Sequence, residues 1–172
     1  AVGNTMRRGA MPAPIAGAPE SIKLFYRVVC APDRINDDLP LLLFLQGGPG
    51  GESPRPLSPT SDGWIEEAVK HFRVVLPDQR GTGRSSCVDG RTIAALGERA
   101  TAAGSDAARS QADFLKRHLV SSIVRDFEYL RLVGFGGKPW VTLGQSYGGF
   151  LTLSYLSLFP EGVAASFTCG GI

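Results

Sequence analysis

Short apolar runs alternate along the chain with polar turns and with stretches of helical periodicity. The apolar runs are rich in β-branched and aromatic residues, which predicts β-strands. They lie at residues 21–30, 41–45, 72–76, 140–143 and 163–169. The run at 41–45 is apolar throughout, as is typical of a strand buried on both faces of a parallel sheet. The run at 21–30 alternates in part, which favours an early antiparallel strand.

Four stretches between or after these runs have the spacing of amphipathic helices. They are residues 64–72, residues 105–119, a helix that Ser121 or Ser122 would cap, and residues 150–159. Residues 87–104 are rich in Ala and Gly and show no clear periodicity. Strands that alternate with helices in this way predict an α/β fold with a mostly parallel, doubly wound sheet.

The 172 residues are enough for one domain with a sizeable core, and 43% of them are hydrophobic, as in soluble globular proteins. We assign residues 21–172 to this domain. Residues 1–20 contain Pro12 and Pro14 and no continuous apolar segment before them, so we expect a flexible leader rather than a signal peptide.

The distribution of charge argues against two classes of partner. The formal net charge of +2 comes from 18 basic and 16 acidic residues that are mixed along the chain. Without a basic stripe or an aromatic platform, nucleic acid is not an expected partner. The longest apolar runs, such as residues 39–45, are too short to span a bilayer, so we expect no membrane partner.

Three cysteines, Cys30, Cys87 and Cys169, are widely spaced and form no CxxC pattern. Free thiols in a reducing compartment are the expectation, which predicts a cytoplasmic protein. Cys30 and Cys169 lie in apolar runs and are expected to be buried. A disulfide between Cys30 and Cys87 remains an alternative.

The strand at 140–143 and the helix at 150–159 are joined by Gly-Gln-Ser-Tyr-Gly-Gly, residues 144–149. Gly-x-Ser-x-Gly between a strand and a helix is the pattern of a nucleophile elbow, a strained turn that lifts a serine hydroxyl above the sheet edge. Glycines are needed at 144 and 148, where a Cβ would collide with a neighbouring strand or helix. Ser146 is therefore a candidate nucleophile, and the N–H of Tyr147 is a candidate oxyanion donor. The alternative is a purely structural turn.

Two further glycine-rich loops follow predicted strands. Gln46-Gly47-Gly48-Pro49-Gly50-Gly51 can turn sharply and present backbone N–H groups, as the second half of an oxyanion hole would. Residues 78–86 place Asp78 and Arg80 among glycines, where we expect the two side chains to pair and rigidify the turn. All of these loops would lie at the carboxyl ends of strands, where ligands bind in open α/β sheets.

In order, the motifs Gln-Gly-Gly-Pro-Gly, Asp-Gln-Arg-Gly-Thr-Gly-Arg-Ser and Gly-Gln-Ser-Tyr-Gly-Gly resemble those of the prolyl aminopeptidase (proline iminopeptidase) family of α/β-hydrolase serine peptidases. The resemblance covers residues 22–172. It implies an α/β-hydrolase fold and an enzyme that releases an N-terminal residue, typically proline, from a peptide with a free N-terminus. It also implies that no metal or cofactor takes part.

By the pattern of that family, Ser146 would be the acylating nucleophile. The backbone N–H groups of Tyr147 and Gly47 would form the oxyanion hole, with Gly48 as the alternative to Gly47. Many family members carry His where this chain has Gln46. Some relatives with Gln there act on longer N-terminal fragments, so the preference for proline is left open.

In this fold the catalytic acid and base follow the nucleophile in the order Asp or Glu, then His. The residues after Ser146 include Glu161 but neither Asp nor His, and the predicted topology places neither His71 nor His118 as the base. We therefore expect the N-terminal part of a hydrolase, with the helical cap and the C-terminal strands absent, nearly inactive alone. The missing part would belong to the same gene product or to a second chain.

Two other functions remain open. Another serine α/β-hydrolase, such as an esterase or acyltransferase, would share the elbow. A non-catalytic hydrolase-fold fragment, acting in binding or assembly, would share the fold without the base. Hydrolases with an Asp nucleophile are excluded, because Ser146 occupies that position.

Overall fold

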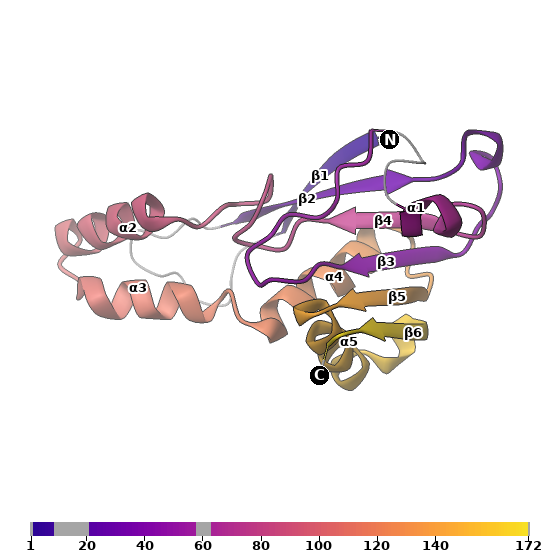
Figure 1. The fold of residues 1–172 in the computed structure, drawn as a ribbon. Helices are drawn as coiled ribbons and strands as arrows, with labels where there is room; N and C mark the ends of the chain where they lie inside the picture. Colours follow the sequence, from indigo (N-terminus) through magenta and orange to yellow (C-terminus); the bar gives the residue numbers. More distant parts are fainter. Residues whose placement is uncertain (1, 9–20, 58–62, 172) are drawn as a thin grey trace.

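The computed structural model describes residues 2–8, 21–57 and 63–171. One sheet of six strands has the order β1-β2-β4-β3-β5-β6 (Figure 1). Strands β4, β3, β5 and β6 are parallel, whereas β2 is antiparallel to both β1 and β4. The prediction of an α/β fold with a mostly parallel sheet is confirmed. The strands are β1 (Val2–Arg8), β2 (Ile22–Val29), β3 (Leu41–Leu45), β4 (Arg73–Pro77), β5 (Trp140–Gln145) and β6 (Val163–Cys169).

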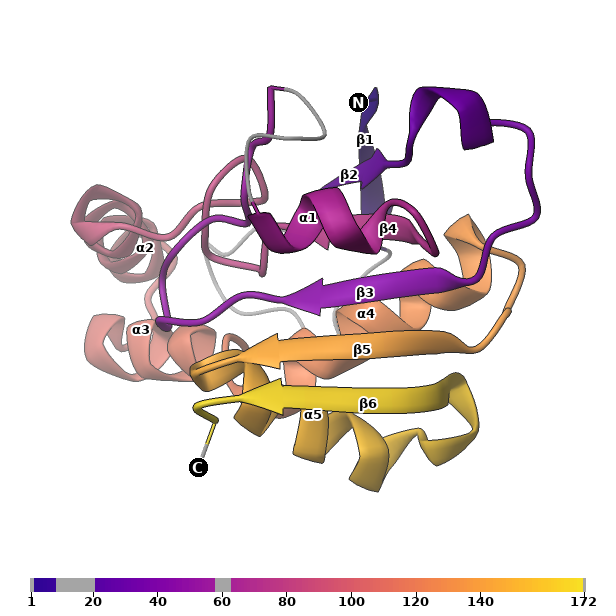
Figure 2. The ribbon, with the colours of Figure 1, turned by 45° about the vertical axis from the view of Figure 1, so that its right-hand side comes forward.

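Helices cover both faces of this sheet. Helix α1 lies on one face, and α4 and α5 lie on the other (Figure 2). Helices α2 and α3 pack together as a hairpin beyond the carboxyl ends of the parallel strands (Figure 1). The helices are α1 (Gly63–Ala68), α2 (Gly90–Ala102), α3 (Ala107–Lys116), α4 (Val120–Gly134) and α5 (Tyr147–Leu158), with short 3₁₀ turns at Pro32–Arg34 and Pro160–Gly162.

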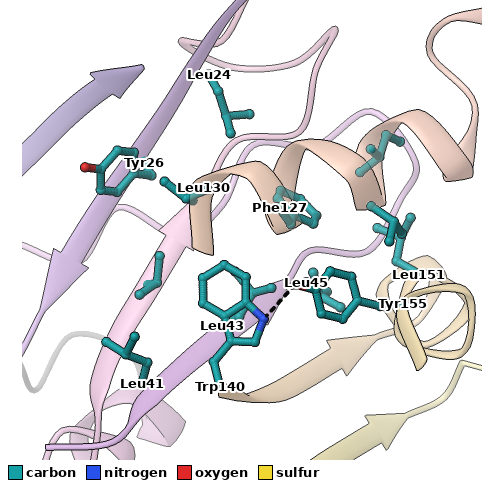
Figure 3. Close-up of a cluster of buried hydrophobic side chains, with 13 residues drawn as sticks. Leu24, Tyr26, Leu41, Leu43, Leu45, Phe127, Leu130, Trp140, Leu151 and Tyr155 are labelled. Atoms are coloured by element: carbon teal, nitrogen blue, oxygen red, sulfur yellow. Dashed lines mark hydrogen bonds between the residues drawn. The ribbon is translucent and has the colours of Figure 1, made fainter. Parts of the chain in front are cut away.

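The alternation of side chains along β3 divides the core into two layers. Leu41, Leu43 and Leu45 join the cluster under α4 and α5, while Leu42 and Phe44 join the cluster under α1. All five are buried, as the uniformly apolar run predicts. In the larger cluster the indole Nε1 of Trp140 donates a hydrogen bond of 3.2 Å to the hydroxyl of Tyr155 (Figure 3). This bond satisfies a buried polar group between β5 and α5.

The first residues of the chain differ from the expected flexible leader. Residues 2–8 form β1, which pairs with β2 over its whole length, from Val2 opposite Val28 to Arg8 opposite Ile22. The pairing satisfies backbone groups along one side of β2 that would otherwise form an open edge. Residues 9–20 of the expected leader lie outside the described residues.

Two helix predictions were also wrong. Residues 90–102, where no helix was expected, form α2: Asp89 caps its first turn by accepting from Thr92 N–H at 2.7 Å, and its buried residues Leu96, Gly97 and Ala100 pack against α3. Helix α4 begins at Val120 rather than after Ser121 or Ser122, and Leu119 precedes it without a side-chain cap. Burial of its apolar face under the sheet compensates for the missing cap.

The cysteines are free in the structure, so the alternative of a bridge between Cys30 and Cys87 is not realised. Cys169 is exposed and Cys30 is half-buried, contrary to the expected burial of both. Cys169 ends β6, whose hydrogen-bonded neighbour among the described residues is β5 alone, so little packs around its thiol. In the same residues, no helix is both long and apolar enough to cross a membrane.

Candidate active site

Ser146 stands at the junction of β5 and α5 with φ 52° and ψ −121°. It is the only non-glycine residue with a positive φ in the part of the chain that the structure describes. Its N–H donates to the carbonyl of Cys169 at 2.8 Å, and its own carbonyl accepts from Gly149 N–H at 2.8 Å. These bonds to β6 and to the first turn of α5 hold the strained backbone. The exposed side chain makes no helix-capping bond, which leaves the hydroxyl accessible.

The glycines on either side of Ser146 are required by close backbone contacts. A Cβ on Gly144 would lie 2.3 Å from the carbonyl oxygen of Gly148, and a Cβ on Gly148 would lie 1.8 Å from that of Leu45. Both distances are far inside any van der Waals contact. The expectation that side chains cannot fit at 144 and 148 is confirmed.

The glycine-rich loop after β3 lies directly against this elbow. A Cβ built on Gly47 would stand 3.1 Å from the Cβ of Ser146. Tyr147 is the first residue of α5, so its N–H has no acceptor within the helix. The structure therefore places the backbone of Gly47 beside Ser146, the residue that immediately precedes Tyr147.

The N–H of Gly47 is already engaged by a neighbouring side chain. It donates to Oε1 of Gln46 at 2.9 Å, and Nε2 of the same Gln46 donates to the carbonyl of Glu52 at 2.8 Å. An oxygen of a ligand would have to displace Oε1 of Gln46 to reach this N–H. The next residue, Gly48, is exposed and has φ +112°, a backbone conformation that favours glycine.

The expected pairing of Asp78 with Arg80 is wrong. Asp78 accepts instead from Nη2 of Arg55 at 2.6 Å and from the N–H groups of Ser53 and Arg84 at 3.1 and 2.8 Å. Arg80 pairs instead with Asp126 on α4: its Nε and Nη2 donate to the two carboxylate oxygens at 2.6 and 2.7 Å. Tertiary neighbours thus outcompete the partner that is near in sequence. The loop after β4 is fastened both to the loop after β3 and to α4.

The two histidines lie in different surroundings. His71 is exposed, 3.6 Å from the carboxylate of Glu67, and precedes β4, at the edge of the sheet opposite Ser146. His118 is half-buried, with Nδ1 3.0 Å from the carbonyl of Phe114, and burial lowers its pKa. Within the described residues, neither histidine hydrogen-bonds to Ser146.

His118 is nonetheless closer to the elbow than the sequence indicated. It lines a hollow of about 190 Å³ together with Tyr147, Pro49 and Gly81. Glu161, the acidic residue after the nucleophile, lies in the turn before β6 and so at the opposite edge of the sheet. In the described part of the chain, no group of three or more His, Cys, Asp or Glu residues could hold a metal ion.

A comparison with known protein families agrees with this strand order and with the strained serine at the end of β5. The sequence model described as the alpha/beta hydrolase fold matches residues 40–171. The chain belongs to the α/β hydrolase family.

Within this hydrolase family, the chain is similar to proteins named proline iminopeptidase. One from Aeromonas sobria is 45% identical over 153 residues, which are 89% of this chain and 33% of that protein. One from Aspergillus aculeatus is 35% identical, over 88% of this chain and 33% of that protein. A solved structure, of a proline iminopeptidase-related protein from Thermus thermophilus, has a TM-score of 0.56 at 20% identity and shares the fold over 98% of this chain and 44% of its own. The chain thus spans about a third of the length of the curated relatives that it matches.

Large apolar side chains are exposed on α5 and on β6. Phe150 and Leu153 on α5 and Phe167 on β6 are 50%, 41% and 57% exposed. Phe150, Leu153 and Leu158 line a surface hollow of about 410 Å³ beside the start of α4. The hollow on α5 is an exposed apolar patch, whereas Phe167 stands beside Leu143 on the other face of the sheet.

Sequence reasoning missed one polar residue of the site. Gln79 follows β4, is 2% exposed, and donates through Nε2 to the carbonyl of Gln46 at 2.8 Å. The motif that follows β4 places Gln79 at the same end of the sheet as Ser146. No local pattern predicts that its side chain binds the carbonyl of Gln46 on the neighbouring loop.

Proposed function

We propose that this chain carries the nucleophile and the oxyanion donors of a serine aminopeptidase that releases an N-terminal residue, preferentially proline, from peptides. The observation that carries the proposal is the strained, exposed Ser146 with the backbones of Gly47 and Tyr147 beside it. The 45% identity to a protein named proline iminopeptidase supports the choice of substrate. The substrate would be a peptide with a free N-terminus.

In the proposed reaction, Oγ of Ser146 attacks the carbonyl carbon of the first peptide bond and forms an acyl-enzyme. The N–H of Tyr147 and the N–H of Gly47 would donate to the negatively charged tetrahedral oxygen. Where the N–H of Gly47 stays bound to Oε1 of Gln46, the N–H of Gly48 would take its place. One such donor contributes about 3–4 kcal/mol to transition-state stabilisation. A base must take the proton of Oγ and return it to the leaving amine, and water then releases the acyl group.

We further propose that this base, its acid partner and the region that recognises the substrate belong to polypeptide beyond these 172 residues, in the same gene product or in a second chain. The relatives are about three times as long, and the apolar hollow lined by Phe150, Leu153 and Leu158 on α5 offers a surface for the added part to cover. The chain alone would be nearly inactive, because loss of a triad member costs several orders of magnitude in rate. The free thiols of the three cysteines support a cytoplasmic location.

A fusion tests this proposal. The chain is joined to the part of the Aeromonas sobria relative that follows the matched region, and turnover of a proline arylamide is compared with that of other aminoacyl arylamides and of short acyl esters. We expect the fusion to exceed the isolated chain by at least about 10³-fold on the proline substrate. Ser146→Ala should abolish this turnover, whereas Ser105→Ala, at a half-buried serine in the turn between α2 and α3, should not.

Two results would contradict parts of this account. Preference of the fusion for short acyl esters over the proline arylamide would identify an esterase rather than an aminopeptidase. Rapid, Ser146-dependent turnover by the isolated chain would show that no added polypeptide is needed.

A further inference from the structure

We propose that Gln79 is a positioning residue that fixes the peptide group carrying the N–H of Gly47. The functional meaning of this role rests on the proposed function, because that function makes residues 46–51 an oxyanion loop. The structural role itself is independent of whether the protein hydrolyses a peptide.

The argument begins with the geometry of one peptide bond. The carbonyl of Gln46 and the N–H of Gly47 belong to the same peptide group, which is planar and trans, so they point in opposite directions. Nε2 of Gln79 donates to that carbonyl at 2.8 Å. By holding the carbonyl, Gln79 determines the direction in which the Gly47 N–H points.

The two ends of this peptide group are held in different environments. The carbonyl is bound by Gln79, which is 2% exposed, whereas the N–H is bound by Oε1 of Gln46, a half-buried side chain. A ligand oxygen that approaches from solvent can replace Oε1 of Gln46, but it cannot reach the bond on the carbonyl side. Gln79 therefore keeps the direction of the Gly47 N–H fixed when a ligand oxygen replaces Oε1 of Gln46 as the acceptor.

Gln79 is suited to this role because the residues on either side of it are fixed. Asp78 accepts hydrogen bonds from Arg55 and from the backbone of Ser53 and Arg84, and Arg80 is paired with Asp126. The carbonyl of Gln79 itself accepts from the N–H and the hydroxyl of Thr82, at 3.1 and 2.9 Å. A side chain that extends from such a turn has little freedom to follow a moving loop.

A matched pair of glutamines allows a direct test. Gln111 donates through Nε2 to the carbonyl of Ile93 at 2.9 Å, which is the same kind of bond in the α2–α3 hairpin, away from the elbow. We compare Gln79→Met and Gln79→Asn with Gln111→Met in the ¹⁵N-labelled 172-residue chain. Met keeps the length of the side chain without the donor, and Asn keeps the amide but shortens its reach.

The readouts are the amide chemical shifts and hydrogen-exchange rates of Gly47 and Gly48. Both Gln79 variants should show their largest shift change at Gly47 and exchange its N–H about tenfold faster, since the net contribution of one hydrogen bond is lost. Gln111→Met should leave both glycines unchanged. If Gln79→Met loses a dispersed spectrum, Gln79→Asn decides the result.

Unchanged Gly47 shifts and exchange in a folded Gln79→Asn chain would overturn the positioning role. Equal effects of the Gln79 and Gln111 variants on Gly47 would overturn it as well, because they would show a general loss of stability. Neither readout depends on the reactivity of Ser146. Failure of the fusion to hydrolyse peptide substrates would therefore refute the proposed function without being confused with failure of this inference.

Discussion

Gly148 lies against Leu45, so that a Cβ on Gly148 would stand 1.8 Å from the carbonyl oxygen at the end of β3. The first turn of α5 therefore packs directly on the strand that leads into the glycine-rich loop. This contact sets the distance between the elbow and residues 46–51. The proximity of Ser146 to Gly47 is a consequence of it.

Gly148→Ala should destabilise the fold by about 3 kcal/mol or more, because neither the helix nor the carbonyl of Leu45 can withdraw without disturbing the sheet. Gly90→Ala is the matched control, since a Cβ at Gly90 meets no atom within 4 Å. Urea denaturation of both variants measures the change in the free energy of unfolding. A loss at Gly148 no larger than that at Gly90 would show that the elbow can relax.

The buried pair of Arg80 and Asp126 should be costly to break. Asp126→Asn leaves a buried guanidinium without its carboxylate, and we expect a loss of about 3–5 kcal/mol in the free energy of unfolding. The control is Glu67→Gln, which breaks the exposed pair with Lys70, 2.6 Å between Nζ and the carboxylate, and should cost less than about 1 kcal/mol. Thermal and urea unfolding measure both losses. Similar losses of unfolding free energy for the two variants would refute the claim that the buried pair contributes more than the exposed one.

Glu128 should make stability depend on pH. Hydrogen bonds from Arg131, at 2.7 and 2.8 Å, lower the pKa of Glu128 in the folded state, and the hydroxyl of Tyr155 adds a bond of 2.6 Å. A depressed folded pKa stabilises the protein above the unfolded pKa of Glu, and this stabilisation is lost as pH falls toward the folded pKa.

The free-energy difference between wild type and Glu128→Gln should accordingly be largest near about pH 6 and should shrink toward about pH 3. Arg131→Met, which removes the main cause of the lowered pKa, should abolish the same dependence. Unfolding by urea across this range provides the measurement. A difference that stays constant with pH would show that Glu128 does not titrate with folding.

Short-range patterns predicted most of what positions the site. The apolar runs at 41–45 and 163–169 coincide with β3 and β6, because runs of β-forming residues specify strands locally. The elbow was predicted from Gly144, Ser146 and Gly148, since the close contacts at the turn leave glycine as the residue that fits on either side of the serine.

Long-range partners could not be predicted in this way. Asp78 and Arg80 are near in sequence but bind Arg55 and Asp126, which the fold brings from other elements. Gln79 was missed for the same reason. Helix α2 packs its buried residues Leu96, Gly97 and Ala100 against α3, and β1 depends on the open side of β2.

The most direct test of the central claim is the mass of the protein after treatment with a fluorophosphonate probe, which reacts with activated serines. We predict a single adduct on the fusion, mapped to Ser146 by peptide analysis and absent in Ser146→Ala, with labelling of the isolated chain slower by orders of magnitude. An adduct that persists in the folded Ser146→Ala fusion, or that maps to another serine, would contradict the assignment of Ser146 as the nucleophile.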